Sequence, residues 1–452
     1  MNQGLTIVPP PVVGEALRRL EARGFRAWCV GGCVRDSLLG KAPFDWDIAT
    51  SALPQETKAC FAGERLVEAG AAHGTIAWVP SGDHPIEITT FRSDGAYTDG
   101  RHPDSVAFSR RLEDDLSRRD FTVNAMAWHP QRGLVDLFHG QEDLSAGLLR
   151  CVGEPARRFS EDALRILRCL RFSSQLGFAI HPDTAQALWE KRELLLALSH
   201  ERVREELTKL LCGQGAAAVL HQYAAVVFTV LPELAPMKGC AQETPYHCFD
   251  VWEHTLHAVD YAPQQGDLRW AALLHDAGKP GRKTRSADGV AHFYGHPPES
   301  GRIARQLLTR LRFSNKERDW IAALVDHHED AMPMGEAHLK GLLGRYGERF
   351  VFTLFQLQEA DMSAKAPGVF ARRLPDLEES RALTRAILER GDCLTLGDMA
   401  LTGEDLKALG VAPGPEMGKL LRRLLEAVQR GEAANTPAAL GELAKRLLER
   451  DL

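Results

Sequence analysis

Residues 30–48, which read VGGCVRDSLLGKAPFDWDI, decide the fold of the N-terminal part of the chain. A short buried strand over residues 26–30 enters Gly31-Gly32 and leaves as a helix, so backbone N–H groups there can approach a phosphate closely. Asp45 and Asp47 stand two residues apart on the next predicted strand, so their side chains share one face. Two carboxylates on one face can hold two Mg²⁺ ions, which would clamp the attacking and leaving oxygens of a phosphoryl transfer.

Each half of this pattern also has a simpler explanation, because a Gly-Gly turn can cap a helix and an aspartate pair can be a solvated surface feature. Their ordered proximity favours the phosphoryl-transfer interpretation. Glu87, in a predicted strand over residues 85–90, is a candidate third carboxylate from a neighbouring strand. Cys33 lies beside the turn without a His or Cys partner pattern, so we interpret it as a small packing residue.

The chain has 452 residues, which is too long for one hydrophobic core and suits three or four domains. Its net charge of −6 argues against indiscriminate nucleic-acid binding, although pairs such as Arg118-Arg119 leave room for a confined RNA track. No apolar run approaches the ~18–20 residues of a membrane span. The nine cysteines are scattered singly, which is typical of reduced thiols and predicts a cytoplasmic protein.

The sequence pattern changes near residue 150. Helix and strand signals are mixed before this point, and helical periodicity dominates after it. The predicted fold class is therefore α+β, with a head made of a small mixed or antiparallel sheet with helices, followed by helical domains. Breaks at residues 231–236 (LPELAP) and 366–368 (APG) are among the signals for four parts. These parts are the head over 1–150, a helical neck over 151–235, a helical domain over 236–370 and a helical tail over 371–452.

Further motifs follow in order: RRDFTVNA at residues 118–125, VDLFHG at 135–140, LLRCV at 148–152 and EDALRILRCLRF at 161–172. Together with residues 401–418 of the tail, they make the chain resemble the class II tRNA nucleotidyltransferase and bacterial poly(A) polymerase family over nearly its whole length. Residues 68–77, EAGAAHGTIA, are similar to the tRNA-specific branch of that family rather than to its poly(A) polymerases.

The resemblance implies an enzyme that adds or repairs the 3′-terminal CCA of tRNA from CTP and ATP, by two-metal nucleotidyl transfer without a nucleic-acid template. It implies the minihelix of the tRNA acceptor and T arms as the partner, with no membrane and no obligate protein partner. Asp45, Asp47 and Glu87 would be the catalytic residues, with Mg²⁺ held by the two aspartates. The nucleotide-binding residues that the resemblance implies are Gly31, Gly32, Arg35, Arg119, Asp120, Asn124, Asp162, Arg165, Arg168 and Arg171.

Alternative functions stay open at this point: an enzyme that adds only the final A, a poly(A) polymerase, or a chain that is mainly a phosphohydrolase. The loop over residues 92–103 bears on the first of these. In the family this loop is linked to switching from C to A addition, and members that add only CC have a deletion there. Its full length here disfavours CC-only addition but does not separate full CCA addition from A-only addition.

A helix is predicted over residues 161–176. Four charged residues recur along it every three positions, namely Asp162, Arg165, Arg168 and Arg171. The simplest explanation is a ladder of ion pairs one turn apart, each worth only ~0.3–0.5 kcal/mol. The resemblance implies instead that Asp162 and Arg165 hydrogen-bond the Watson–Crick edge of the incoming base. A carboxylate can accept from the exocyclic amine that C and A share, and a guanidinium can donate to ring positions.

A second constellation lies in the helical body. Its members are metal-ligand side chains on separate predicted helices: His254, His275, Asp276, His296, His328 and Asp361. Such side chains can complete a metal site in a helical core, and the set resembles an HD-type metal-dependent phosphohydrolase domain. In that resemblance His254, His275, Asp276 and Asp361 are the core ligands of Mg²⁺ or a divalent transition metal, and His296 and His328 make the site binuclear. The domain could hydrolyse a phosphate ester or serve only as a tRNA-binding scaffold.

The tail carries a weaker signal. Residues 409–418 are rich in glycine and proline and precede an amphipathic helix over residues 419–430. The N-terminus of such a helix can contact backbone phosphates, so the tail could grip the tRNA minihelix. A capped surface helix explains the same pattern equally well.

Overall fold

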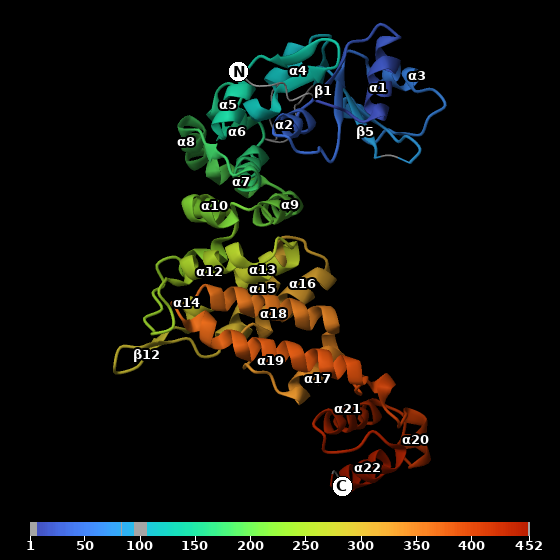
Figure 1. The fold of residues 1–452 in the computed structure, drawn as a ribbon, viewed down its shortest axis with the longest axis vertical. Helices are drawn as coiled ribbons and strands as arrows, with labels where there is room; N and C mark the ends of the chain where they lie inside the picture. The colour runs from blue at the N-terminus through green and yellow to red at the C-terminus, as the bar shows by residue number, and fades with distance from the viewer. Residues whose placement is uncertain (1–6, 83, 95–105, 451–452) are drawn as a thin grey trace. The chain divides into compact units, whose positions relative to one another are not determined.

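The computed structural model describes residues 7–82, 84–94 and 106–450. Two compact units make up the chain, residues 1–232 and residues 233–452. The first unit contains the main sheet, and the second is mostly helical (Figure 1). The α+β class predicted from the sequence is therefore confirmed.

A seven-stranded mixed sheet forms the head, in the strand order β3-β4-β5-β2-β1-β8-β9. The β2–β5 pair is parallel, and the other neighbouring pairs are antiparallel. Strand β5 alternates as an amphipathic strand should, because Ile86 and Ile88 are buried while Glu87 is exposed. The strands of this sheet are β1 (Ala27–Val30), β2 (Asp47–Thr50), β3 (Leu66–Val67), β4 (Thr75–Trp78), β5 (Ile86–Thr90), β8 (Met126–His129) and β9 (Gly133–Asp136).

Helices of the head bury one apolar face each. The first of them begins at Pro11, a favourable first position for proline because no helical N–H is lost there, and it buries Val13, Leu17 and Leu20 at helical spacing. The helices of the head are α1 (Pro11–Glu21), α2 (Gly32–Leu38), α3 (Pro54–Cys60), α4 (Leu112–Ser117) and α5 (Gly140–Ala146).

The loop linked to C-to-A switching is described only at its flanks. Strands β6 (Arg92–Asp94) and β7 (Val106–Phe108) pair in antiparallel fashion. Residues 95–105 lie outside the described residues, so the inference from the loop's length stays a prediction.

The single neck helix predicted over residues 161–176 is wrong, because the chain forms two helices there. Asp162 separates them with an extended backbone, at φ −141° and ψ 105°. Its side chain accepts a hydrogen bond from the backbone N–H of Leu164 at 3.0 Å, which competes with helix continuation. The helices of the neck are α6 (Pro155–Glu161), α7 (Leu164–Leu176), α8 (Pro182–Lys191), α9 (His200–Leu211), α10 (Ala216–Gln222) and α11 (Ala224–Val230).

The second unit is built around a helical core. Within it α15 packs along α16, while α12 and α13 both contact α18. Trp252 on α12 and Trp270 on α13 are fully buried and fill this core. Its helices are α12 (Val251–Tyr261), α13 (Gly266–Leu274), α14 (Lys279–Arg282), α15 (His296–Arg310), α16 (Asn315–His327), α17 (Glu336–Tyr346), α18 (Glu348–Ser363), α19 (Val369–Arg390), α20 (Gly403–Ala408), α21 (Pro415–Gln429) and α22 (Pro437–Arg450).

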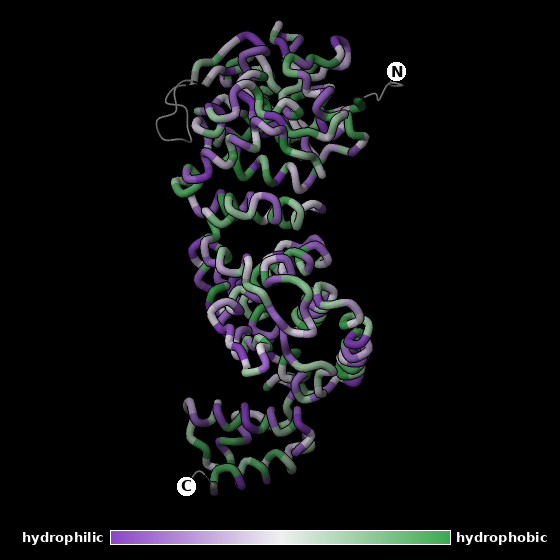
Figure 2. The backbone as a smooth tube through the Cα atoms, turned by 90° about the vertical axis from the view of Figure 1, so that its left-hand side faces the viewer, coloured by the Kyte–Doolittle hydropathy of each residue, from purple (hydrophilic) through white to green (hydrophobic). Residues whose placement is uncertain are grey.

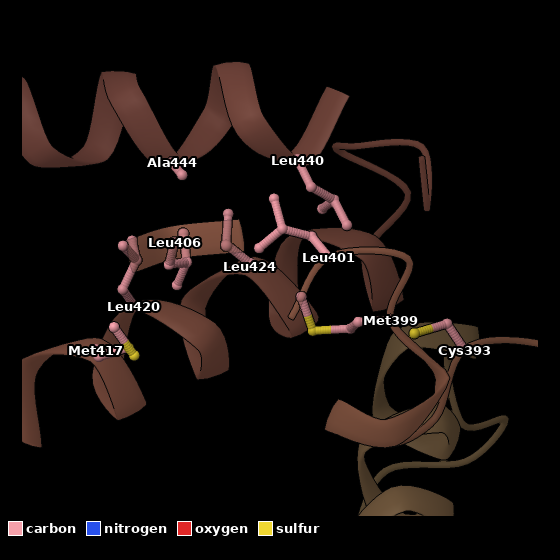
Figure 3. Packing of buried hydrophobic residues seen from close by; sticks show 9 residues of the cluster. All are labelled: Cys393, Met399, Leu401, Leu406, Met417, Leu420, Leu424, Leu440 and Ala444. Atoms are coloured by element: carbon pink, nitrogen blue, oxygen red, sulfur yellow. The ribbon is translucent and has the colours of Figure 1, made fainter. Parts of the chain in front are cut away.

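The tail has a hydrophobic cluster of its own. Leu406 from α20, Leu424 from α21 and Leu440 from α22 pack together in it (Figure 3). The cluster starts at Cys393, just after α19 ends at Arg390. The division of the chain into four parts remains a prediction.

Hydrophilic and hydrophobic residues are interspersed along the helices of both units, as amphipathic helices require (Figure 2). Among the described residues, no helix combines the length and the apolar character that crossing a membrane would need. All nine cysteines are free thiols. Cys33 is buried, and its thiol donates to the backbone oxygen of Val30 at 3.3 Å.

Candidate active site and metal centre

Three acidic residues lie around the start of β2, an interior strand of the head sheet, and we call Asp45, Asp47 and Glu87 the carboxylate cluster. Asp47 is the first residue of β2 and is the register partner of Glu87 on the parallel strand β5. The spacing predicted that Asp45 lies on the strand with Asp47. In the structure Asp45 lies in the loop that precedes β2. Burial, followed by the charges of Asp45 and Glu87, raises the pKa of Asp47 to about 6. The cluster therefore concentrates negative charge, and a bound cation would relieve it.

The turn between β1 and α2 takes the form predicted from the two glycines. Gly31 has a φ of +79°, which disfavours residues with a side chain. A Cβ atom at this position would lie 2.9 Å from Nη1 of Arg119, so the glycine also makes room for that guanidinium. The turn and Arg119 thus share one small region of the head. Arg119 also contributes to the charge balance at Asp47, where it opposes the rise in pKa.

Asp115 positions Arg119, and sequence reasoning missed it. Its side chain is fully buried on α4, and Oδ2 accepts from Nη2 of Arg119 at 3.0 Å. Oδ1 accepts from Nη2 of Arg118 at 2.6 Å. Burial favours the neutral acid, but the two arginines outweigh it and hold the pKa of Asp115 below its usual value. The available signal was an acidic residue four positions before Arg119.

Buried and partly buried hydrogen bonds connect four of the predicted nucleotide-binding residues. Nη1 of Arg35 donates to Oδ1 of Asn124 at 2.6 Å, and Nδ2 of Asn124 donates to Oδ1 of Asp120 at 3.2 Å. Arg168 on α7 donates to Oδ2 of Asp120 through Nε and Nη2, at 2.9 and 2.6 Å. Burial opposes the charge of Asp120, but Arg168 outweighs it and holds the pKa of Asp120 at about 2. This network joins the neck to the head.

The charged residues of the neck mostly pair with other elements rather than with each other. Asp162 pairs with Arg202 on α9, and Arg171 pairs with Glu206 on the same helix at 2.6 Å. Arg165 pairs with Glu161 at 2.8 Å, one turn away. Of the ladder of ion pairs one turn apart that the sequence suggested, the described ion pairs contain only the Arg165–Glu161 contact.

The six metal-ligand side chains of the second unit converge, and we call them the histidine–aspartate cluster. Two groups of three share Asp276: one with His254 and His275, the other with His296 and His328. The remaining member of the cluster, Asp361 on α18, lies with Oδ1 3.0 Å from Nε2 of His254. All six side chains are buried.

Asp276 occupies the centre of this cluster. Its Oδ1 lies 3.2 Å from Nε2 of His296 and 3.6 Å from Nε2 of His328. Its Oδ2 lies 3.4 Å from Nε2 of His254 and 3.3 Å from Nε2 of His275. Each carboxylate oxygen thus faces two imidazole nitrogens, and this set of donors would suit a divalent metal ion.

The opposite ring nitrogen of every histidine in the cluster faces a backbone oxygen. These Nδ1···O distances are 3.1 Å for His254, 2.8 Å for His275, 3.0 Å for His296 and 2.7 Å for His328. A proton on Nδ1 satisfies each carbonyl and directs Nε2 at Asp276 or its neighbours. Backbone geometry therefore orients all four imidazoles with Nε2 facing the centre of the cluster.

The carboxylates of the cluster also pair with lysine ammonium groups. Burial lowers the pKa of His275, but Asp276 outweighs it and raises that pKa to about 10. Lys279 lies with Nζ 2.6 Å from Oδ2 of Asp276, and Lys365 lies 2.7 Å from Oδ2 of Asp361. A cavity of about 440 Å³ adjoins the cluster and is lined by His328, Asp361 and Lys365 among others.

His327 belongs to a different group of side chains. Its Nδ1 lies 2.8 Å from Oδ2 of Asp330, and Nε2 of His338 lies 2.7 Å from the same oxygen. His328, the member of the predicted ligand set, is the one that the fold places beside Asp276 and His296.

Comparison with known families identifies three segments of the chain. Residues 27–150 match the poly A polymerase head domain. Residues 177–237 match a model described as "Probable RNA and SrmB- binding site of polymerase A". Residues 298–444 match the domain described as tRNA nucleotidyltransferase domain 2.

Curated relatives and solved structures agree with this. The chain is 35% identical over 429 residues to the CCA-adding enzyme of Lactobacillus delbrueckii subsp. bulgaricus, covering 94% of this chain and 95% of the relative. It is 36% identical over 425 residues to that of Levilactobacillus brevis, covering 94% of both chains. The crystal structure of the Bacillus stearothermophilus CCA-adding enzyme in complex with CTP is 31% identical, with a TM-score of 0.75, covering 98% of this chain and 100% of that one. The chain therefore belongs to the CCA-adding enzymes of the tRNA nucleotidyltransferase and poly(A) polymerase family.

Proposed function

We propose that this chain adds or repairs the 3′-terminal CCA of tRNA, using CTP and ATP and no nucleic-acid template. One observation carries the proposal: the carboxylate cluster lies at the start of β2, beside a strand–turn–helix whose Gly31 packs against Arg119. The curated relatives are CCA-adding enzymes, and one solved relative holds CTP, which supports the same assignment.

The carboxylate cluster suits divalent metal ions. Its oxygens are hard ligands, and the raised pKa of Asp47 reflects a charge density that a cation would neutralise. Asp45 and Asp47 would hold two Mg²⁺ ions, with Glu87 as a third carboxylate. Bound Mg²⁺ would supply Lewis-acid stabilisation of the attacking and leaving oxygens.

Other side chains would bind and select the nucleotide. The backbone of the Gly31 turn and the guanidinium of Arg119 would contact the triphosphate. Asp120 makes its described contacts with protein groups, so its role would be to position Arg168 and Asn124. Asp162 and Arg165 would read the Watson–Crick edge of the base.

The first test offers the purified protein three tRNA transcripts with labelled CTP, ATP or both. The transcripts end before the first C, after the first C and after the second C. Addition of CCA to the shortest transcript, stopping there, is the expected result. A single A added only to the longest transcript would identify an A-adding enzyme, and an unlimited run of A would identify a poly(A) polymerase.

Variants test the residue roles in the same assay. Asp45→Ala is expected to lower the rate by on the order of 1,000-fold or more, because a metal-binding carboxylate is lost. Glu113→Gln on α4 is the matched control, since it removes an exposed carboxylate of the head. Full turnover by a folded Asp45→Ala protein would refute the metal assignment.

A second activity is proposed at the histidine–aspartate cluster, namely hydrolysis of a phosphomonoester or cyclic phosphate with Mg²⁺ or a divalent transition metal. The position of Asp276 between two pairs of imidazoles carries this proposal. Hydrolysis of p-nitrophenyl phosphate and of cyclic nucleotides would be measured with Mg²⁺, Mn²⁺ and Ni²⁺. Asp276→Ala should abolish hydrolysis and metal uptake while CCA addition continues, and His338→Ala is the control outside the cluster. A protein that binds no metal there would instead favour the scaffold alternative.

The tail and the cellular location complete the proposal. Arg422 and Arg423 are exposed on α21 and would contact tRNA phosphates. Nine free thiols suit a reducing compartment, so the protein would work in the cytoplasm.

A further inference from the structure

Three neighbouring strands of the head sheet share one end at the carboxylate cluster. Asp47, at the start of β2, has register partners at the end of β1 and near the start of β5. Gly31 follows β1, Asp45 precedes β2 and His84 precedes β5, so all three lie beyond this same end. Since β2 lies between β1 and β5, the loop with Asp45 has the Gly31 turn on one side and the segment of His84 on the other.

An exposed pair of aromatic rings lies beside the cluster. Phe44 directly precedes Asp45 and is 82% exposed. The centroid of its ring lies 5.4 Å from that of His84, which is also exposed, with an interplanar angle of 44°. A single exposed apolar side chain is common on protein surfaces and needs no function. The place of this ring is what matters, because it leaves an aromatic face open to a ligand next to a carboxylate that is proposed to bind Mg²⁺.

The geometry of nucleotidyl transfer determines where the RNA must lie. The attacking 3′-OH and the departing pyrophosphate stand roughly in line on opposite sides of the α-phosphate. The triphosphate is proposed to bind at the Gly31 turn and Arg119, which is the β1 side of Asp45. The tRNA end therefore approaches from the β5 side, where Phe44 meets His84.

We infer that the ring of Phe44, supported by His84, stacks on the base of the 3′-terminal nucleotide of the tRNA and so places its 3′-OH at the carboxylate cluster. That base is attached to the same sugar as the attacking 3′-OH, so it lies within one nucleotide of the metal ions. An aromatic face accepts every base, which suits an RNA end whose last base changes with each addition. The inference rests on the nucleotidyl transfer proposed for the carboxylate cluster.

The test compares two tRNA transcripts that end after the second C. One is intact, and the other has a terminal nucleotide that keeps its 3′-OH but lacks the base. The value of kcat/KM for each transcript is measured for addition of one A from ATP. The wild-type protein should use the abasic transcript ~10–100-fold less efficiently, which is the loss typical of one stacked base.

Substitutions of Phe44 show whether this ring is the one that stacks. Phe44→Ala should lower kcat/KM for the intact transcript by ~10-fold or more, and its further penalty for the abasic transcript should shrink by a similar factor. Phe44→Leu should behave in the same way, because it is apolar but has no ring. Phe44→Trp keeps an aromatic face and should resemble the wild type. The KM for ATP should stay unchanged in all three, because the ring lies on the RNA side of the cluster.

Controls separate stacking from support of the loop. Val67→Ala trims an exposed apolar side chain on β3 of the same sheet, and it should leave both the rate and the penalty unchanged. If Phe44 only holds Asp45 in place, Phe44→Ala and Phe44→Leu lose activity and need more Mg²⁺ but keep the full abasic penalty, and the inference is overturned. Equal use of the two transcripts by the wild-type protein overturns it as well.

The same experiment distinguishes this inference from the proposal on which it rests. If the wild-type protein adds no A to the intact transcript, the proposed function fails and the inference fails with it. If the wild-type protein adds A and shows the abasic penalty, while Phe44→Ala keeps both the rate and the penalty, only the stacking role of Phe44 fails.

Discussion

Replacing Asp47 with asparagine is expected to stabilise the metal-free protein at neutral and alkaline pH while it removes nucleotidyl transfer. Burial is the main cause of the raised pKa of Asp47, and the charges of Asp45 and Glu87 add to it. Both effects disfavour a charge on Asp47 in the folded chain. An amide of the same shape carries no charge and escapes both of them.

The pKa shift sets the size and the pH range of this effect. The pKa of Asp47 rises from its ordinary value of 3.8 to about 6. A shift of one unit corresponds to ~1.4 kcal/mol, so ionised Asp47 lowers the free energy of unfolding by about 3 kcal/mol. The folded state keeps its proton to higher pH than the unfolded state, so this loss develops between about pH 4 and pH 6 as the pH rises. The advantage of Asp47→Asn is therefore complete above about pH 6 and absent below about pH 4.

The assay is hydrogen exchange of peptides that cover β2 and β5, together with urea unfolding, both in EDTA. Measurements at about pH 8 and about pH 4 bracket the titration, and Glu113→Gln serves as the exposed control. Asp47→Asn should protect β2 and β5 more strongly than the wild type at the higher pH only. Equal stability of the two proteins at the higher pH, or an equal gain at both pH values, would refute the electrostatic reasoning.

Two further substitutions test the packing of the head. Arg168→Ala should lower the free energy of unfolding by ~3–5 kcal/mol, because it leaves the buried charge of Asp120 unpaired; urea unfolding measures this, and no loss would refute the importance of the pair. Gly31→Ala should cost ~1–3 kcal/mol and slow CCA addition, because the backbone has positive φ and the new Cβ would meet Arg119. Gly24→Ala has a similar φ of +82° but nothing within 4 Å, so it controls for the backbone strain alone.

Local patterns in the sequence were sufficient to predict much of the secondary structure of the head. The alternation around Ile86 and Ile88 predicted β5, because side chains of a strand point to opposite faces. The two glycines at 31 and 32 predicted a strand–turn–helix, and the positive φ of Gly31 is the backbone form that such a turn requires. The family resemblance came from the order of the motifs, and that order can be read from the sequence without any structure.

Periodicity failed where a side chain competed with the backbone. Helical periodicity over residues 161–176 predicted one continuous helix, but the carboxylate of Asp162 accepts a hydrogen bond from the N–H of Leu164 and interrupts it. Strand alternation likewise placed Asp45 on a strand that begins only at Asp47. Periodicity reports only how residue types are spaced along the chain, so it cannot predict a hydrogen bond between one side chain and the backbone.

The sequence by itself determined the fold class, the candidate residues and the family, because these follow from periodicity and from residue types in a fixed order. Only the tertiary structure decided which side chains meet. Asp162 and Arg202 are 40 positions apart, and His254 and Asp361 are 107 apart, yet each pair is in contact. Such contacts depend on how distant helices pack, and packing is set by the burial of apolar faces that many arrangements could satisfy. The central place of Asp276 therefore became visible only once the helices were in position.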